Sequence, residues 1–294
     1  MTSSIRNRVT YFPVATQAQF ARNHAHVLGK PYEHYFNGDL WLHEEVMDAI
    51  RAPIDAARVI APDPAGMNSL LDPGYHEVES GYCEMADGSG YVASLVPFPG
   101  CSGEAFRWWF WWHSVEPARY ALWYPYNHVA ANPVDRDVLT APDLTDQERY
   151  IGNTHLVDEY MGPDLIKIAI AFVDPKELGF DTARFEEAGI VGHACARISL
   201  RSAHLEAATM VHLARQTDDG FELRSRYWFG YDPKVSVLGH SIALGNVASA
   251  VGMQRRMGAG RLAYEQLLHD QIEFTHLSTF LAGIHAEFGS AAPA

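Results

Sequence analysis

A histidine and a glutamate, His269 and Glu273, stand four residues apart in a stretch of the sequence that lacks glycine and proline. Residues at this spacing share one face of an α-helix, and His276 and Phe280 continue the stripe. Apolar residues flank it, so the pair would lie at the edge of a buried face, where a carboxylate is costly unless paired or bound to a cation. An imidazole and a carboxylate so placed can bind one metal ion. The alternative is a neutral histidine hydrogen-bonded to a surface glutamate.

Further metal ligands would have to come from other parts of the chain. His128 follows the aromatic segment 120–126, and we expect it at a strand end because the proline in that segment breaks strand hydrogen bonding. A second histidine–glutamate pair with the same spacing is His155 and Glu159, and Asp158 is an alternative carboxylate. The residues alone leave the choice among these three open.

The composition excludes several classes of protein. The 294 residues are 48% hydrophobic and 20% charged, which is typical of a globular chain with a sizeable core. The formal charge of −14 argues against binding to nucleic acid or to an anionic membrane surface. No apolar run approaches the roughly 20 residues of a membrane helix. The 15 histidines are scattered rather than gathered in a tract, which is compatible with a metal site.

The cysteines and the start of the sequence predict a compartment. Cys83, Cys101 and Cys195 are odd in number and scattered, so they suggest no disulfide framework. The first residues lack the apolar segment and cleavage site of a secretory signal. We therefore expect a cytoplasmic protein whose cysteines are small buried residues.

The elements that would position these side chains change character along the chain. The first part, residues 1–80, is expected to form a small helical domain with helices over 15–28 and 40–59. Residues 81–294 are expected to form a second domain in which strands begin. Aromatic and β-branched segments predict these strands, and an Asp-Gly turn at 219–220 predicts a hairpin. The predicted strands cover residues 81–85, 90–96, 118–124, 165–173, 194–200, 207–215 and 221–231.

A long helix over residues 262–286 is expected to end the fold. Strands followed by one long helix indicate the α+β class, with the helix lying across a strongly curved antiparallel sheet. This arrangement leaves a cavity between helix and sheet. The aromatic run 108–112 is expected to be core or cavity wall.

Four short segments also carry a family resemblance. They are Trp123-Tyr-Pro-Tyr-Asn-His128, His155-Leu-Val-Asp-Glu159-Tyr, Arg226-Tyr-Trp-Phe-Gly230 and His269-Asp-Gln-Ile-Glu273-Phe. In their order the chain resembles the diacetylphloroglucinol hydrolase family, which includes phloretin hydrolase. The resemblance extends from about residue 80 to the end, and the first third is similar only in its helical character.

The resemblance implies a zinc-dependent hydrolase that cleaves the carbon–carbon bond between an acyl group and a polyhydroxylated ring, as in 2,4-diacetylphloroglucinol. It also implies a helix-grip fold like that of the pollen allergens of the Bet v 1 superfamily, and it suggests a homodimer. The family's zinc ligands correspond to His128, Glu159, His269 and Glu273. Its contacts to ring hydroxyls correspond to Tyr120, Tyr227 and Asn132, and a histidine near the substrate corresponds to His212. His204 competes with His212, and Asn127 competes with Asn132.

Other chemistries have less support in the sequence. There is no Gly-x-Ser-x-Gly nucleophile elbow and no phosphate-binding loop after a strand. The main alternative is a non-catalytic carrier that holds an aromatic ligand in the same cavity. A carrier needs no clustered histidines and glutamates, so bound metal would distinguish the two. A metal enzyme with a different reaction would share the ligands and differ only in the pocket.

Overall fold

The computed structural model describes residues 6–203, 205–237, 240–243, 255 and 258–290. In this part of the chain the main feature is a nine-stranded antiparallel sheet in the order β3-β4-β10-β9-β8-β7-β6-β5, with β11 paired to β10. Its strands are β3 Gly81–Glu84, β4 Gly90–Pro99, β5 His128–Pro133, β6 Thr154–Met161, β7 Asp164–Val173, β8 Ile190–Leu200, β9 Leu205–Thr217, β10 Gly220–Val237 and β11 His240–Ala243. The mixed α+β class with a large antiparallel sheet and a C-terminal helix is therefore confirmed.

The hairpin between β9 and β10 forms where the Asp-Gly turn predicts it. Thr217 pairs with Gly220 across the turn. Gly220 has a φ of 139°, and a Cβ there would collide with the backbone of Phe98 on β4. Only glycine combines this backbone conformation with so close a neighbour. The turn thus fixes the register of the two longest strands.

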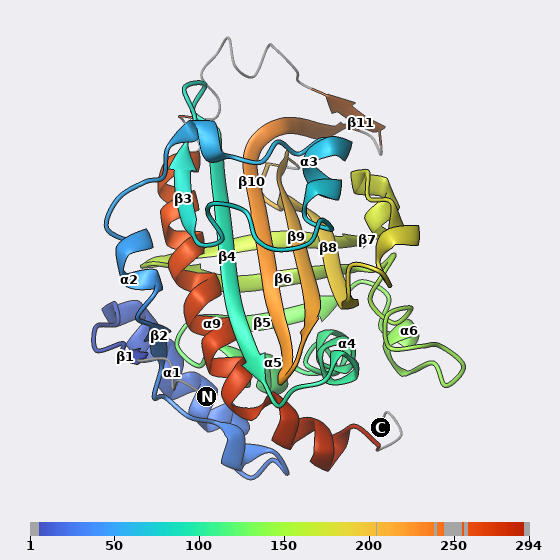
Figure 1. Ribbon diagram of the computed structural model, residues 1–294. Coiled ribbons are helices and arrows are strands. Elements are labelled where there is room, and N and C mark those ends of the chain that lie inside the picture. Colours follow the sequence, from blue (N-terminus) through green and yellow to red (C-terminus); the bar gives the residue numbers. More distant parts are fainter. Residues whose placement is uncertain (1–5, 204, 238–239, 244–254, 256–257, 291–294) are drawn as a thin grey trace.

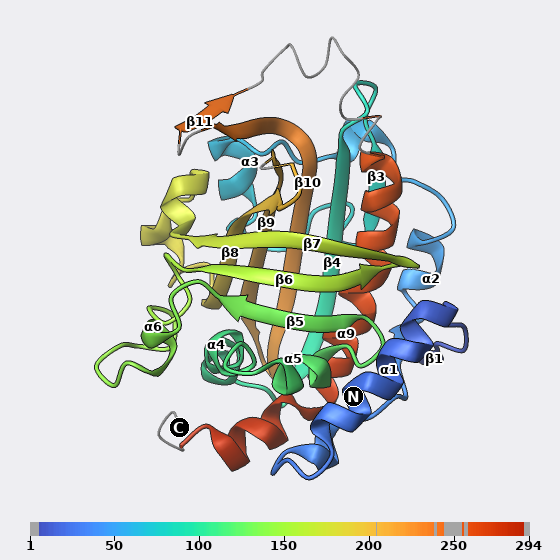
Figure 2. The ribbon, with the colours of Figure 1, turned by 180° about the vertical axis from the view of Figure 1, so that it is seen from behind.

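The sheet curves strongly, and helices fill its inner side. In Figures 1 and 2, β5, β6 and β7 run crosswise to β4, β10 and β9. The long helix α9, Ala259–Phe288, packs along β3 and β4. Helices α4, Gly103–Trp112, and α5, Pro117–Trp123, complete the inner core. The predicted helix over 262–286 is confirmed.

Helix α4 contains the aromatic run and is buried on nearly every side. The Ser102 hydroxyl caps it by accepting from the backbone N–H of Ala105 at 3.1 Å. A helix that is apolar all round belongs inside a core. Trp108 and Trp109 are indeed almost inaccessible, at 1% and 0% exposure, which confirms the prediction for residues 108–112.

A second apolar core covers the outer side of the sheet. Helix α3, Pro64–Ser69, and its flanking loops pack Met67 and Leu70 against Trp228 of β10. Asp63 caps α3 by accepting from the backbone N–H of Gly66 at 2.8 Å. The central strands are therefore buried on both faces, which explains why they do not alternate simply between apolar and polar residues.

Two predicted elements are wrong. Residues 118–124, predicted as a strand, form helix α5, because Pro117 at its first turn has the φ of a helix. Residues 40–59, predicted as one helix, contain strand β2, Trp41–His43, which pairs with β1, Arg6–Arg8. The helical part is limited to one turn of α-helix, α2, Val46–Ala49, and the 3-10 turn Ala56–Arg58. Packing of Leu40 and Leu42 against Ile272 of α9 outweighs the helical pattern.

The remaining elements lie at the periphery. Helix α1, Val14–Val27, confirms the first predicted helix. The others are α6 Asp137–Thr140 and the 3-10 turns Glu33–Tyr35, Ala56–Arg58, Pro175–Leu178 and Thr182–Arg184. Val27 and Tyr32 belong to the same apolar core as α4 and α9, and the division of the chain at residue 80 stays a prediction.

Cys83, Cys101 and Cys195 are buried and free, as predicted. Among the described helices, none has both the length and the apolar character that a membrane crossing requires.

Candidate metal centre and cavity

Three elements deliver four acidic and imidazole side chains to one point between α9 and the sheet. Helix α9 presents His269 and Glu273 on its buried side, one turn apart. His128 is the first residue of β5, and Glu159 is its cross-strand partner on β6. All four side chains are buried, with at most 8% exposure. The strand register and the helical spacing thus bring together residues that are far apart in the sequence.

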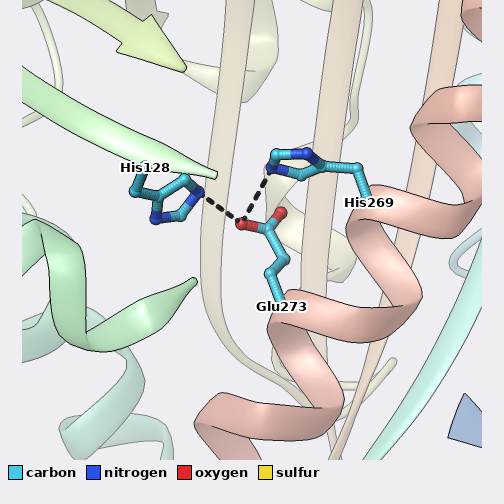
Figure 3. Close-up of side chains that lie close together, drawn as sticks. All are labelled: His128, His269 and Glu273. Atoms are coloured by element: carbon cyan, nitrogen blue, oxygen red, sulfur yellow. Dashed lines mark ion pairs between the residues drawn. The ribbon is translucent and has the colours of Figure 1, made fainter. Parts of the chain in front are cut away.

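The carboxylate of Glu273 lies between the two imidazoles (Figure 3). Its Oε2 is 3.1 Å from Nε2 of His128 and 3.6 Å from Nε2 of His269. One ligand atom from each of these residues fits within 4.8 Å of the others. Oε2 of Glu159 is 4.0 Å from Nε2 of His128. The structure therefore brings His128, His269 and Glu273 into one group and places Glu159 beside His128, and the full set of four ligands stays a prediction.

The imidazole of His128 shows that this cluster suits a cation. Its Nδ1 donates to the backbone carbonyl of Tyr120 at 3.2 Å, so the neutral ring carries a lone pair on Nε2. Burial, together with His269, lowers the pKa of His128 well below its ordinary value and keeps the ring neutral. Nε2 is buried, has no hydrogen-bond partner among the described residues and faces a carboxylate oxygen. A metal ion placed between this nitrogen and the carboxylate would be bound by both.

Burial and nearby charges also shift the pKa values of the two ligands on α9. Burial raises the pKa of Glu273 although the His269 imidazole opposes this. Burial would lower the pKa of His269, but the carboxylates of Glu273 and Glu159 outweigh it and raise the pKa. Two imidazoles and two carboxylates would neutralise a divalent ion, and this donor set is suited to Zn²⁺.

Two tyrosines flank the cluster. The Tyr120 hydroxyl donates to Oε2 of Glu159 at 2.7 Å, and its ring stacks on that of His128 with centroids 3.8 Å apart. The Tyr227 hydroxyl donates to Asp270 at 2.7 Å. Burial raises the pKa of both tyrosines well above the usual value. Both phenols therefore stay protonated, each with its proton directed at a carboxylate.

His212 is joined to Tyr227 in a buried chain of polar groups. Its Nε2 lies 3.3 Å from the Tyr227 hydroxyl, and its Nδ1 lies 2.8 Å from the hydroxyl of Ser225. Burial lowers the pKa of His212 to about 3, so the ring is neutral. The chain holds His212 and Tyr227 in fixed orientations beside the cluster.

These polar groups surround a cavity between α9 and the sheet. Its polar lining comprises His113, Tyr120, His155, Glu159, His212, Tyr227, Gln266, His269 and Glu273. The rest of the wall is largely apolar and includes Phe110, Phe172, Ile168 and Met210. An apolar pocket with a few convergent polar groups is the usual form of a small-molecule site.

The other sequence candidates lie elsewhere. Asn132 is exposed on β5 and does not line the cavity. Asn127 is buried, but its amide nitrogen donates to the backbone carbonyl of Tyr160 at 2.8 Å. His204 lies outside the described residues. Asp158 points to the opposite face of β6, where it pairs with Arg201 and with Lys167, so the structure favours Glu159 over Asp158.

Sequence reasoning missed part of the cavity wall. It considered His155 only as a ligand candidate and did not single out His113 or Gln266. Alternation along β6 contained the signal, because His155, Val157 and Glu159 share its buried face. His113 gave no comparable signal, since it directly follows the buried helix α4.

The chain is similar to a described family and to several curated proteins. A family model described as "DAPG hydrolase PhiG domain" matches residues 60–286. The 2,4-diacetylphloroglucinol hydrolase of Pseudomonas protegens is 36% identical over 290 residues, covering 96% of this chain and 92% of that protein. A protein of the same name from Pseudomonas sp. is also 36% identical, covering 96% and 97%. The phloretin hydrolase of Eubacterium ramulus is 28% identical over 208 residues, covering 70% and 71%.

Among solved structures, "Crystal structure of Ara h 8.0201" aligns with a TM-score of 0.31 and 9% identity, over 62% of this chain and 99% of that one. A TM-score this low does not establish a shared fold.

Proposed function

The chain belongs to the diacetylphloroglucinol hydrolase family, and from this premise we propose that it hydrolyses the carbon–carbon bond between an acyl group and a polyhydroxylated aromatic ring. The substrate class is the acylphloroglucinols, with 2,4-diacetylphloroglucinol and close analogues as first candidates. The products are a carboxylic acid and the ring with one acyl group fewer. The observation that carries the proposal is the buried His128 nitrogen facing the Glu273 carboxylate beside an apolar cavity.

We propose that His128, Glu159, His269 and Glu273 hold a zinc ion. Two observations support a divalent cation in this position. Nε2 of His128 has no hydrogen-bond partner among the described residues, and His128, His269 and Glu273 each offer a ligand atom within 4.8 Å of the others. When bound, such an ion supplies Lewis-acid polarisation of the acyl oxygen and favours ionisation of water near neutral pH. Buried histidine and carboxylate ligands favour zinc over calcium or magnesium, which prefer oxygen ligands alone.

Tyr120 and Tyr227 would help the aromatic ring to depart as a leaving group. An aryl carbanion is a poor leaving group, whereas a hydroxylated ring protonated at the acyl-bearing carbon leaves as a stabilised enolate. Tyr120 and Tyr227 direct their own protons at carboxylates, so their oxygens accept hydrogen bonds from ring hydroxyls. When a ring hydroxyl passes its proton to a tyrosine oxygen, and that tyrosine passes its own proton to the carboxylate, the ring becomes electron-rich. Its acyl-bearing carbon then takes up a proton from water to give the keto tautomer. His212, held through Ser225 and Tyr227, orients the ring within the cavity.

The surroundings of the site complete the proposal. Residues 81–294 would form the catalytic domain with a helix-grip arrangement, in which the curved sheet wraps around α9. Residues 1–80 would form the added N-terminal domain. We further propose that the protein acts in the cytoplasm as a homodimer.

The test combines elemental analysis of untagged protein with an assay of acid release from acylphloroglucinols. We expect stoichiometric zinc and release of acetate from 2,4-diacetylphloroglucinol, with both lost after chelation and restored by zinc. A metal-free protein that binds the acylphloroglucinol and returns it intact would contradict the proposal and indicate a carrier.

A further inference from the structure

The cavity is lined by a buried imidazole that the proposed reaction has not used, that of His155. It lies on β6 on the same face as Glu159, four residues away along the strand, which corresponds to ~13 Å. The side chain lines the cavity and is 2% exposed. His155 therefore lies at the end of the cavity remote from Glu159.

The hydrogen bonds around His155 determine which ring nitrogen is free. Its Nδ1 lies 3.1 Å from the Ser114 hydroxyl, which in turn donates to the backbone carbonyl of Phe110 at 3.4 Å. We infer that the Ser114 proton stays directed at this carbonyl, so that the hydroxyl oxygen accepts from Nδ1–H of His155. Nε2 then carries a lone pair and has no partner among the described residues. Burial lowers the pKa of His155 to about 3, which keeps the ring neutral.

The walls next to this nitrogen are mainly apolar. Phe172 packs edge-on against the His155 ring, with centroids 4.9 Å apart, and Val157 and Ile170 also line the cavity. A buried acceptor left without a donor costs about 1–3 kcal/mol. A ligand hydroxyl that donates to Nε2 of His155 would remove this cost, so this end of the cavity is suited to a hydroxylated ligand.

Because Asn132 is exposed, the Nε2 acceptor of His155 can take over the ring-hydroxyl contact that the resemblance assigns to Asn132. The resemblance assigns Asn132 a contact to a ring hydroxyl, but its side chain faces solvent. His155 pairs with the adjacent residue, Pro133, across the two strands and faces inward. It can supply a hydroxyl contact that Asn132 cannot make from its position.

We propose that Nε2 of His155 accepts a hydrogen bond from the ring hydroxyl para to the acyl group that is cleaved, and so selects acylphenols that carry this hydroxyl. The inference rests on the proposed function, which places the cleaved acyl group at the His128–Glu273 cluster. The para hydroxyl is the ring substituent farthest from that acyl group. It therefore points away from the cluster, toward the remote end of the cavity where His155 lies.

The test compares 2,4,6-trihydroxyacetophenone with 2,6-dihydroxyacetophenone, which lacks only the para hydroxyl. We expect the ratio of their kcat/KM values to fall about tenfold or more in His155→Phe relative to wild type, which is the loss of one buried hydrogen bond. The decrease in kcat/KM should affect only 2,4,6-trihydroxyacetophenone, because 2,6-dihydroxyacetophenone has no para hydroxyl to lose a hydrogen bond. His155→Gln keeps an acceptor near Nε2 and should restore part of the ratio. His193→Phe removes a half-buried imidazole that packs against Phe185 outside the cavity, and should leave the ratio unchanged.

Equilibrium binding of phloroglucinol and resorcinol gives a readout that does not depend on turnover. Wild type should bind phloroglucinol more tightly, and His155→Phe should bind the two with similar Kd values. A folded His155→Phe with the wild-type kcat/KM ratio and the wild-type Kd ratio would overturn the role of His155 while acid release by wild type upholds the proposed function. If wild type releases no acid from 2,4-diacetylphloroglucinol, the proposed function fails. If it releases acid from that substrate but from neither of these two ketones, the proposed function holds and the Kd ratio alone decides the role of His155.

Discussion

Strand β10 carries two buried polar clusters, one on each face, and they differ in how their charges are matched. On the outer face, Arg224 and Arg226 bind the carboxylate of Glu79, with N–O distances of 2.6 and 2.5 Å. On the inner face, Ser225 and Tyr227 belong to the polar lining around the His128–Glu273 cluster. The two faces follow from simple alternation along one strand. We call the outer set, Glu79 with Arg224 and Arg226, the arginine cluster.

The arginine cluster is matched within the chain. Two guanidinium groups surround one carboxylate, and Arg224 also donates to the backbone carbonyl of Leu70 at 2.7 Å, which ties the loop after α3 to the sheet. The inner cluster contains the carboxylates of Glu159 and Glu273 and the imidazoles of His128 and His269, and Nε2 of His128 has no hydrogen-bond partner among the described residues. The contrast teaches that burial of charge alone does not mark a functional site. A functional site is indicated instead by buried acceptors that lack matching donors.

The largest expected effect comes from a substitution in the inner cluster. Glu273→Gln keeps the size of the side chain but removes a charged ligand, and we expect bound zinc to be lost and kcat/KM to fall by about a thousandfold or more. Elemental analysis measures the bound zinc, and the acid-release assay measures kcat/KM. Glu287→Gln, at the exposed end of the same helix, serves as the matched control because it removes the same charge outside the cavity.

A folded Glu273→Gln variant with full zinc content and activity would remove Glu273 from the proposed ligands. This result would also contradict the contrast between the arginine cluster and the inner cluster, because a buried acceptor without a matching donor would then have no functional consequence.

How far the sequence predicts these clusters depends on whether local periodicity connects their members. Helical spacing alone paired His269 with Glu273, and strand alternation along β6 separates Glu159 from Asp158. Tyr120 was expected on a strand and lies on α5, because a run of aromatic residues has no period that distinguishes a buried helix from a strand. The arginine cluster escaped notice because Glu79 lies far from its partners in the sequence, and only the fold joins them.

In the arginine cluster, the matched substitution Glu79→Gln should affect stability rather than activity. It leaves two buried guanidinium groups without their carboxylate, which typically costs about 3–5 kcal/mol. We expect a correspondingly lower free energy of unfolding in urea, with wild-type zinc content and kcat/KM per folded molecule. If the variant loses zinc or activity while remaining folded, the arginine cluster supports the site and the two faces are not independent.

The pH dependence of stability sharpens the comparison further. Burial would raise the pKa of Glu79, but Arg226 and Arg224 outweigh it and lower the pKa from 4.5 to about 2. Because this pKa is lower in the folded than in the unfolded state, ionised Glu79 stabilises the fold above about pH 4.5. That contribution is lost as the pH falls toward 2. A fall of this size in pKa corresponds to about 3 kcal/mol at neutral pH.

The difference in unfolding free energy between wild type and Glu79→Gln should therefore narrow by about 1 kcal/mol between pH 7 and pH 3.5, as measured by urea unfolding at each pH. Both proteins keep the inner cluster, so any protonation of its ligands cancels in the difference. Asp48→Asn removes the same charge from an exposed pair with Arg51 and controls for the relief of overall negative charge. A difference that stays constant across this range would mean that Glu79 contributes through packing, and that matched charge does not distinguish the outer face from the inner one.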